Sequence, residues 1–352
     1  MAIRSCLILT LAALSGTSFA LQSQQEPVFR SEALTEKTRK SIEKGLEYLR
    51  RARTEHGSIG DKFVLATTSL AGLAFLGGGS QYNRGEYGTE VRDCVKFVVQ
   101  ELSLSGKFRS SGKSARTSQM HSQGYALLFL AEVYGMVPPE EQAQLNLREK
   151  MQRSIQRLLD AQTRHGGWGY HFQHESGFGS DESSTTVCVI QALRACRNAG
   201  FTVDRGRVDR AIDYVKRCAT EDGSFRYQVS EDQRTSYELT AAAVATLNAS
   251  GVYSSAELER GVAYMRTKMD EARNPGAAAK NFYYYGNFYA VQAIHQSGGD
   301  LWRIYYPQIT EHIISKQQPK GFWENSRGVG YATAMAILSL ELPLQYLPIF
   351  QR

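Results

Sequence analysis

The sequence predicts an all-α protein whose chain closes into one α/α toroid of six helical hairpins, with six inner and six outer helices. Three observations predict it. A glycine followed by an aromatic or large apolar residue recurs along the chain, an amphipathic segment precedes each copy, and an apolar segment rich in small residues follows it. Such recurrence is typical of folds that stack one supersecondary unit many times.

The glycine markers recur at steps of about fifty to sixty residues. The last two copies are a double step apart, and the aromatic segment KNFYYYGNFYAVQAI from Lys280 occupies the missing place without a glycine turn. The spacing therefore predicts six copies. The markers read HGSIG near Gly57, GKF at Gly106, GGWGY at Gly166, DGSFRY at Asp222 and KGFW at Lys320.

The segment before a marker is predicted to form an amphipathic helix. In GRVDRAIDYVKRC the apolar Val208, Ile212 and Val215 recur at helical steps between charged residues. The segments RKSIEKGLEYLRR, MQRSIQRLLDAQ and ELERGVAYMRTKM follow the same pattern. Each of these helices buries one face and exposes the other.

The segment after each marker position carries few charges: FVLATTSLAGLAFLGG, GYALLFLAEVYG, TTVCVIQALRAC, LTAAAVATLNASG, NFYAVQAIHQSGG and YATAMAILSLELP. A helix that is apolar on nearly all sides must be buried on nearly all sides. The inner helices are therefore expected to close into a ring, because an open solenoid, the competing arrangement, leaves one inner face wet. Glycines expected in the left-handed position after these helices are Gly77, Gly135, Gly200, Gly251 and Gly298.

The first residues, MAIRSCLILTLAALSGTSFA, have the charge, short apolar core and small-residue end of a secretory signal peptide. The apolar part is too short to span a membrane. We therefore predict a leader over residues 1–20 that is cleaved near Ala20, an N-terminal extension over 21–34 and one toroid domain over 35–352. The expected location is exported, either periplasmic or extracellular.

Charge and cysteine usage narrow the partners and the redox chemistry. The net charge is +6 with no long basic run, so no nucleic-acid partner is expected. No CxxC pair occurs, and we predict buried thiols, while one or two disulfides stay open for an exported chain. The cysteines after the leader are Cys94, Cys188, Cys196 and Cys218.

These segments resemble the superfamily of squalene and hopene cyclases and the β subunits of protein prenyltransferases, over nearly the whole chain after the leader. The strongest segment is GGWGYHFQHESGFGSDESSTTVCVIQALRACRNAG, and DGSFRY and KGFW are similar to weaker copies of the cyclase repeat. The stretch from YYYGNFYAVQAIHQSGGDLW to YLPIFQR resembles exported bacterial proteins described as prenyltransferase-like. The resemblance implies the toroid fold and no single activity.

The resemblance also implies catalytic sets that this chain departs from. Class II terpene cyclases protonate an alkene with a DxDD motif; here Asp181 matches the first position, and Ser183 and Ser184 stand at the last two. Protein prenyltransferases bind zinc through an Asp, a Cys two residues later and a later His, but Ser183 follows Asp181 and RTSYELT has no His. The thioester motif GCGEQ of complement proteins is also missing from the sequence. We therefore expect no metal and no cofactor.

The candidate site follows from the predicted ring. All inner helices of an alternating toroid begin at one end, so residues near those starts meet at one mouth, where helix N-termini favour an anionic group. Asp61 and Arg327 occupy such places. The candidate catalytic residues are Asp181, Glu182 and His121. The candidate ligand-binding residues are Gln123, Tyr125, Tyr237, Glu238, Tyr284, Tyr285, Asn287 and Tyr331.

Several of these residues have a structural alternative. Asp181 and Glu182 precede a helix, where carboxylates cap free N–H groups, and His121 suits an internal hydrogen bond. Adjacent tyrosines on a helix point in different directions, so at least one tyrosine of the FYYY run should face the cavity. Trp168, Phe225 and Trp323 recur at the turns, which predicts plugs between neighbouring repeats.

The expected function is ligand or partner binding in the cavity or at its mouth by a non-catalytic exported toroid. The alternative is an enzyme with a divergent site, either directed at isoprenoid lipids or acting as a polysaccharide lyase or hydrolase. A purely structural protein with a filled cavity is a third hypothesis. The expected partners are a small molecule, a lipid or a glycan in the cavity, or a protein at the mouth, which the insertion HFQHESGFGSDESS is expected to overhang.

Overall fold

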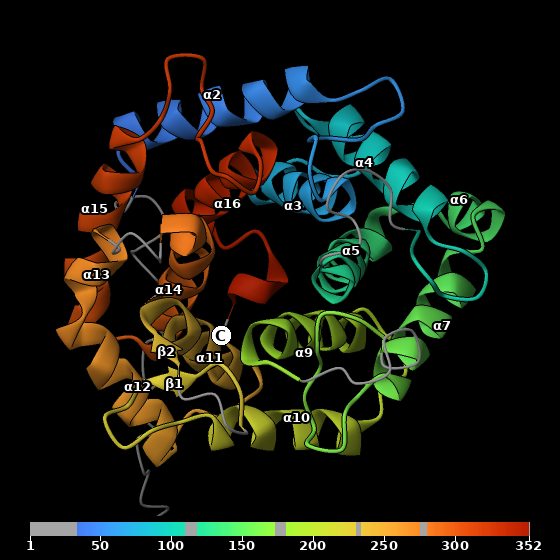
Figure 1. Ribbon diagram of the computed structural model, residues 1–352. Helices are drawn as coiled ribbons and strands as arrows, with labels where there is room; N and C mark the ends of the chain where they lie inside the picture. The colour runs from blue at the N-terminus through green and yellow to red at the C-terminus, as the bar shows by residue number, and fades with distance from the viewer. Residues whose placement is uncertain (1–33, 110–117, 173–180, 230–233, 275–279, 352) are drawn as a thin grey trace, which may run out of the picture.

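The computed structural model describes residues 34–109, 118–172, 181–229, 234–274 and 280–351 (Figure 1). These residues form helices apart from one very short hairpin. None of their helices is long and apolar enough to cross a membrane. The predicted leader and most of the insertion expected to overhang the mouth, residues 173–180, lie outside the described residues.

Six amphipathic helices form the outer layer within this part of the chain. In α2 one face buries Ile42, Leu46 and Leu49, and the Thr35 hydroxyl caps the helix by accepting a hydrogen bond from the backbone N–H of Thr38 at 3.1 Å. The outer helices are α2 (Glu36–Ala52), α4 (Gly88–Glu101), α7 (Leu147–Asp160), α10 (Arg205–Arg217), α12 (Ala256–Thr267) and α15 (Asp300–Ser315).

Six inner helices lie inside this layer and are buried along almost their whole length. Each packs against the next, and the last returns to the first, so the ring is closed (Figure 1). Small residues allow the close approach: a β-carbon on Gly124 would stand 2.6 Å from Sγ of Cys188. The inner helices are α3 (Val64–Gly77), α5 (Gln119–Val133), α9 (Ser183–Asn198), α11 (Tyr237–Ala249), α14 (Tyr283–Ser297) and α16 (Val329–Glu341).

The arrangement confirms the predicted toroid of six inner and six outer helices, and the four cysteines in the described residues are buried free thiols. The segment from Lys280 supplies the sixth inner helix, α14. Short elements complete the fold: α6 (Pro139–Gln144), α13 (Met269–Arg273), η1 (Tyr134–Met136), η2 (Lys280–Phe282), η3 (Leu342–Leu344) and η4 (Pro348–Phe350).

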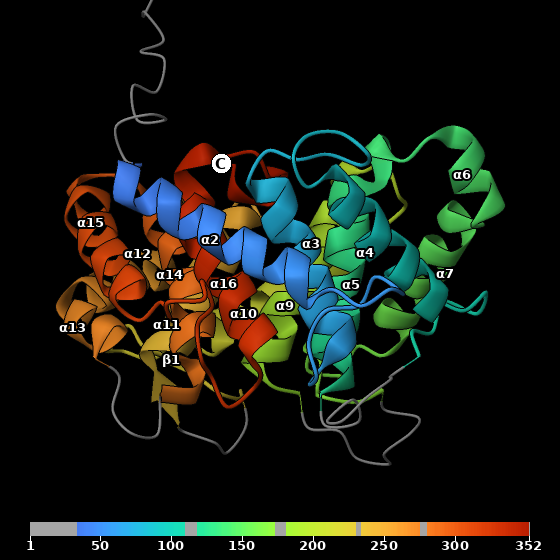
Figure 2. The same ribbon diagram turned by 90° about the horizontal axis from the view of Figure 1, so that it is seen from above.

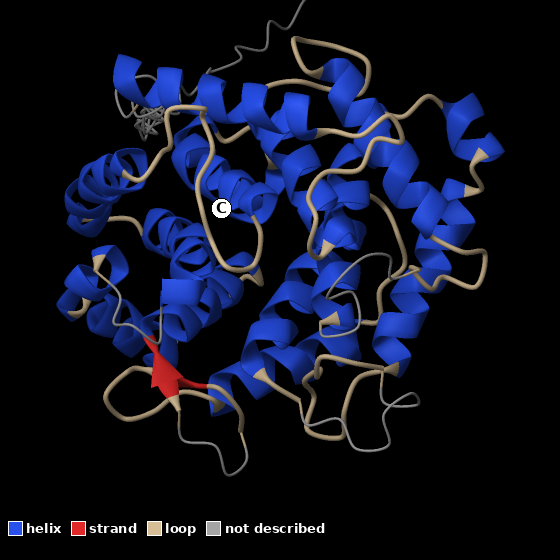
Figure 3. Cartoon of the chain, turned by 45° about the horizontal axis from the view of Figure 1, so that its top comes forward, coloured by secondary structure: helices blue, strands red, loops and turns tan. Residues whose placement is uncertain are grey.

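One antiparallel hairpin was not predicted. It consists of β1 (Phe225–Arg226) and β2 (Thr235–Ser236), with Phe225 opposite Ser236. The hairpin lies beside α11, and Figure 2 shows it at the opposite end of the ring from the C-terminus. Figure 3 shows it as the one strand pair among helices in the described chain.

The aromatic residues of the markers are plugs between repeats, as predicted. Trp168, Phe225 and Trp323 are fully buried. Each tryptophan donates its indole N–H to a carbonyl near the end of the preceding outer helix, Trp168 to Leu158 at 2.6 Å and Trp323 to Ile313 at 2.7 Å. Each indole therefore adds a hydrogen bond to the carbonyl-rich end of the preceding outer helix.

The glycines that follow the inner helices behave as predicted in three places. Gly200, Gly251 and Gly298 have φ of 84°, 84° and 72°. The prediction was wrong for Gly77 and Gly135. Gly77 is still the last residue of α3, and a later glycine in the same run of glycines turns the chain. Gly135 lies in η1, where a tighter helical turn continues the chain.

The C-terminal segment closes one end of the ring. Phe350 is buried and its ring lies 6.5 Å from that of Phe288 in α14. Gln296 donates from Nε2 to the Ile349 carbonyl at 3.5 Å. In Figure 1 the last red segment lies within the outline of the ring, and Figure 2 shows it at the end of the ring opposite β1.

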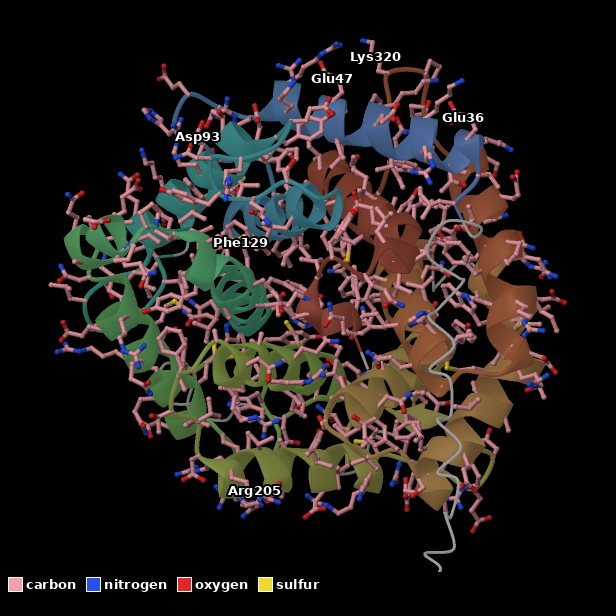
Figure 4. All side chains as sticks on the ribbon, turned by 180° about the vertical axis from the view of Figure 1, so that it is seen from behind. Glu36, Glu47, Asp93, Phe129, Arg205 and Lys320 are labelled. Atoms are coloured by element: carbon pink, nitrogen blue, oxygen red, sulfur yellow. The ribbon has the colours of Figure 1, made fainter. Side chains whose placement is uncertain are left out.

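Charged side chains are segregated to the periphery. Figure 4 shows Glu36, Glu47, Asp93, Arg205 and Lys320 around the outside of the ring and Phe129 within it. The outer helices carry this charge because only one of their faces is buried. The inner helices therefore have no charged surface to present to solvent except at their ends.

Candidate functional site

A pocket of about 470 Å³ opens at the end of the ring where the inner helices begin. This volume lies in the range of small-molecule sites, about 300 to 1,000 Å³. All six inner helices contribute, through Ala66, His121, Ser184, Glu238, Tyr285 and Tyr331. The pocket confirms that these helix starts converge on one mouth, and it shows that the mouth is hollow.

Aromatic rings form much of the pocket wall. The hydroxyls of Tyr170 and Tyr227 are 2.6 Å apart, and Phe282 also lines the pocket. Two arginines cover rings of this wall: the guanidinium of Arg234 is 4.6 Å from the Tyr227 ring centre, and that of Arg327 is 4.7 Å from the Phe282 ring centre. Most of the wall surface is therefore apolar, and Arg234 and Arg327 give it positive charge.

His121 lies in the pocket as a neutral base. Its Nδ1 is 2.7 Å from the Ser118 hydroxyl, and its Nε2 is 3.4 Å from the Ser184 hydroxyl. Burial lowers the pKa of His121 to about 4, and the positive charge of Arg327 acts in the same direction. At neutral pH the imidazole therefore offers one N–H and one lone pair to its neighbours and to a ligand.

The deep part of the pocket is built from tyrosines. Tyr125, Tyr285 and Tyr331 line it, and Tyr289 packs behind Tyr285 with ring centres 4.8 Å apart. The hydroxyl of Tyr285 is buried and has no hydrogen-bond partner among the residues that the structure describes. Burial raises the pKa of all four phenols, so they remain protonated and available as donors. A ligand group that accepts a hydrogen bond would satisfy Tyr285.

Asp181 and Glu182 do not line this pocket. Asp181 accepts hydrogen bonds from Thr163 and, at 3.1 Å, from His165 Nδ1. Glu182 is the N-cap of α9, because its carboxylate accepts from the backbone N–H groups of Ser184 at 2.9 Å and Thr185 at 2.6 Å. Burial raises the pKa of Glu182, and its hydrogen bonds oppose that shift. These contacts favour the capping interpretation for Glu182.

The other candidates divide between residues that line the pocket and residues that do not. His121, Tyr125, Glu238, Tyr285 and Tyr331 line the pocket together with Arg327. Asp61, Gln123, Tyr237, Tyr284 and Asn287 are not among its lining residues.

Asn287 has a structural role in the interior. It donates to the carbonyls of Ala272 at 3.1 Å and Tyr283 at 2.9 Å, and it accepts from the Tyr305 hydroxyl at 2.8 Å. Its amide therefore ties α14 to α13 and α15.

Part of the pocket wall was not predicted from the sequence. Tyr170 and Tyr227 each follow a buried plug by two residues, Trp168 and Phe225 respectively. This shared spacing could have identified both tyrosines. In each of the two markers the first aromatic residue is the buried plug, and the aromatic residue two positions later lies at the mouth. No comparable pattern marks the remaining missed residues, which are Phe63, Ala66, Ser118, Ser122, Ser184, Arg234, Thr235, Ser236, Leu239 and Phe282.

Metal ligands are not gathered in the described residues. No group of three or more His, Cys, Asp or Glu side chains in this part of the chain is placed to hold an ion. The neighbourhood of Asp181 illustrates this. Within the described residues, His165 is the one imidazole bonded to the Asp181 carboxylate. The hydroxyls of Ser183 and Ser184 donate hydrogen bonds to other acceptors.

The chain belongs to the family of the prenyltransferase alpha-alpha toroid domain, whose model matches residues 36–276 and, in a second overlapping match, residues 112–323. No curated protein sequence matches the chain.

Solved structures share the fold at low identity. A variant of the type II terpene cyclase MstE from Scytonema, in complex with its product merosterolic acid A, has a TM-score of 0.61 and 14% identity over 87% of this chain and 97% of that chain. A second MstE variant holds its substrate, geranylgeranyl dihydroxybenzoate, and has a TM-score of 0.60 and 14% identity over 88% and 98%. The family 76 glycoside hydrolase (mannosidase) Bt3792 from Bacteroides thetaiotaomicron has a TM-score of 0.59 and 11% identity over 87% and 98%. These likenesses show the toroid fold.

Proposed function

We propose that this protein is an exported toroid that binds an amphiphilic small molecule in the mouth pocket, with an apolar isoprenoid or aromatic body and a polar or anionic head. The single observation that carries the proposal is the pocket of about 470 Å³ with aromatic walls and two arginines. A purely structural ring would be filled by side chains at this place. The hollow mouth therefore favours a ligand.

The chemistry of the walls supports this ligand class. Tyr125, Tyr285 and Phe282 offer ring faces and edges to an apolar chain. Arg327 and Arg234 offer charged donors near the opening. The geranylgeranyl dihydroxybenzoate bound by MstE combines a prenyl chain with an aromatic acid head, and a molecule of that kind would match both parts of the pocket.

Catalysis has less support than binding. Hydrolysis of glycosides uses a pair of carboxyl groups that flank the scissile bond, and Glu238 is the one carboxylate among the described lining residues. Protonation of an alkene needs a free acid, and the oxygens of Glu182 are occupied by Ser184 and Thr185. An isoprenoid-directed enzyme stays the second candidate, because Glu182 is a buried carboxyl group with a raised pKa at the position where the cyclase motif is expected.

A binding measurement tests the proposal. Geranylgeranyl dihydroxybenzoate and the uncharged geranylgeraniol are added to the full chain, with heat of binding and melting temperature as readouts. Both should bind and raise the melting temperature, since a ligand that prefers the folded state stabilises it. Ala66→Trp, which fills the pocket, should abolish both effects.

Arg327→Gln separates head recognition from tail recognition. The affinity for the dihydroxybenzoate should fall about tenfold or more through loss of a charged hydrogen-bond donor, while the affinity for geranylgeraniol stays unchanged. Absence of binding by both ligands, or binding that survives Ala66→Trp, would contradict the proposal. Product detected by mass spectrometry would replace it with the enzyme hypothesis.

Export and domain limits are separate parts of the proposal. The leader over 1–20, the extension over 21–34 and one toroid domain over 35–352 rest on the sequence pattern alone. Expression of the full chain in a bacterium followed by N-terminal sequencing should give a mature protein that begins near Leu21 in the exported fraction. An intact Met1 in the cytoplasmic fraction would contradict it.

A further inference from the structure

A second pocket lies at the far end of the ring from the mouth. It has a volume of about 310 Å³ and is formed by the end of α9, the start of α10 and Ser250 at the end of α11. Figure 1 shows α9 and α10 side by side. Because α9 begins at the mouth, its last turns and this pocket lie away from the ligand pocket described above.

Three arginines and one acid line the second pocket. Arg194 and Arg197 project from the last turns of α9, and Arg205 begins α10. Asp209 is the one acidic lining residue described, and it forms an ion pair with Arg205 at 3.6 Å. The pocket therefore carries an excess of two positive charges at neutral pH.

Arg194 and Arg197 are not used by the fold. Within the described residues neither guanidinium donates a hydrogen bond, whereas two arginines nearby do: Arg148 donates to the Gly200 carbonyl at 3.5 Å, and Arg207 donates to the Leu159 carbonyl at 3.2 Å.

Arg194 is also partly buried. Burial, and to a smaller extent the charge of Arg197, lower its pKa, while Tyr253 and Glu132 favour its charged form. The guanidinium is open to the pocket rather than sealed in the core, and an anion there would replace its water with charge-assisted hydrogen bonds.

Part of the pocket floor is apolar, beside a larger polar lining. Ile190 and Leu193 are buried, and Val208 and Ile212 are partly buried against the core. A bare inorganic anion would leave this floor covered by water alone. A ligand with both an anionic group and a compact apolar body would use the whole lining.

We propose that this pocket binds a small carboxylate with a compact apolar body, such as an aromatic acid, whose carboxylate lies between Arg194 and Arg197. Guanidinium groups pair with carboxylates through two parallel hydrogen bonds. The volume of about 310 Å³ suits a molecule of that size and excludes a folded partner. The proposal does not depend on the mouth pocket or its ligand.

The experiment uses the full chain and three probes: benzoate, the uncharged benzyl alcohol and inorganic phosphate. Binding is measured by calorimetry and by ligand-observed NMR. Benzoate should bind more tightly than either of the others, at least tenfold more tightly than benzyl alcohol, because the alcohol keeps the ring and loses the charge-assisted bonds. Equal or tighter binding of phosphate would overturn the assignment of an apolar body.

Four variants localise the site. Arg194→Gln and Arg197→Gln should each weaken benzoate binding about tenfold or more, and Arg148→Gln, which changes a neighbouring arginine outside the pocket, should not. Arg327→Gln, at the mouth, reports separately on any benzoate that binds in the mouth pocket. If Arg194→Gln fails to fold, the exposed Arg197→Gln decides. Benzoate that does not bind, or that loses affinity in Arg327→Gln and keeps it in Arg197→Gln, overturns the proposal.

Discussion

Gly321, in the last marker, lies against the backbone carbonyl of Lys44 in the first outer helix. A β-carbon on Gly321 would stand 2.3 Å from that oxygen, and φ of Gly321 is 95°. The contact joins the last repeat to the first and so closes the ring. The other marker glycines make the equivalent contact with the next outer helix along the chain, for example Gly166 with Arg210.

Gly321→Ala is expected to destabilise the closed ring more than an alanine at an ordinary left-handed glycine. Gly251→Ala is the matched control, because Gly251 has a similar φ of 84° and nothing within 4 Å of its would-be β-carbon. The control should lose about 1 to 2 kcal/mol of unfolding free energy from backbone strain alone. Gly321→Ala should lose a further ~1 to 3 kcal/mol from overpacking against the Lys44 carbonyl. Chemical denaturation compares them, and equal losses would contradict the ring-closing role.

Glu182→Gln is expected to cost about 0.5 to 2 kcal/mol of unfolding free energy, because the amide replaces one of the two acceptor oxygens that cap α9. Ligand affinity at the mouth should stay unchanged, since Glu182 does not line the pocket. Thermal unfolding and calorimetry measure the two effects in one protein preparation. A variant with the wild-type melting temperature and no ligand binding or turnover would reverse the assignment and make Glu182 a site residue.

Burial of whole segments could be predicted from sequence, because it depends on composition. The low charge of TTVCVIQALRAC and LTAAAVATLNASG required both segments to lie inside, and they form most of α9 and α11. Marker aromatics such as Trp168 were predictable as plugs because their place in the repeat recurs. The ring is therefore encoded by patterns repeated many times along the chain.

Individual side-chain directions at the mouth could not be predicted. Successive residues of a helix differ by about 100° in direction, and the rotation of α14 is fixed by its packing against α11, α15 and α16. Tyr285 thus faces the pocket, whereas Asn287, two residues on, is bonded to Tyr305 of α15. Arg234 comes from a hairpin that is too short to leave a periodic signal.

His121 is expected to titrate near pH 4, because burial and Arg327 both disfavour its charged form. The ordinary pKa of histidine is about 6.5, so protonation favours the unfolded chain and stability falls as the pH drops from about 6.5 towards 4. His121→Gln should remove that part of the pH dependence. NMR titration of the imidazole, assigned with the variant, measures the midpoint, and a value near 6.5 would contradict the buried neutral state.

Glu341 ends α16 with a carboxyl group that the fold does not satisfy. The side chain is 1% exposed, and within the described part of the chain neither of its oxygens has a hydrogen-bond partner. Its Oε2 would stand 2.5 Å from a β-carbon on Gly77, so it lies against the end of α3, where backbone carbonyls add negative partial charge. Burial raises the pKa of Glu341 well above its ordinary range, and the group is held as a neutral acid.

Glu341→Gln is therefore expected to stabilise the protein at pH 8 and to have little effect at pH 4. The raised pKa means that the folded state binds this proton more tightly than the unfolded chain, so wild-type stability falls by about 1.4 kcal/mol per pH unit from about pH 4.5 up to the folded-state pKa. Glutamine carries no charge at any pH and removes that loss. Urea unfolding at both pH values measures the difference, with Glu221→Gln in an exposed turn as the control that should change stability by less than about 0.5 kcal/mol. A Glu341→Gln variant that gains nothing at pH 8 relative to pH 4 would mean that the carboxyl group is ionised and paired in the folded ring.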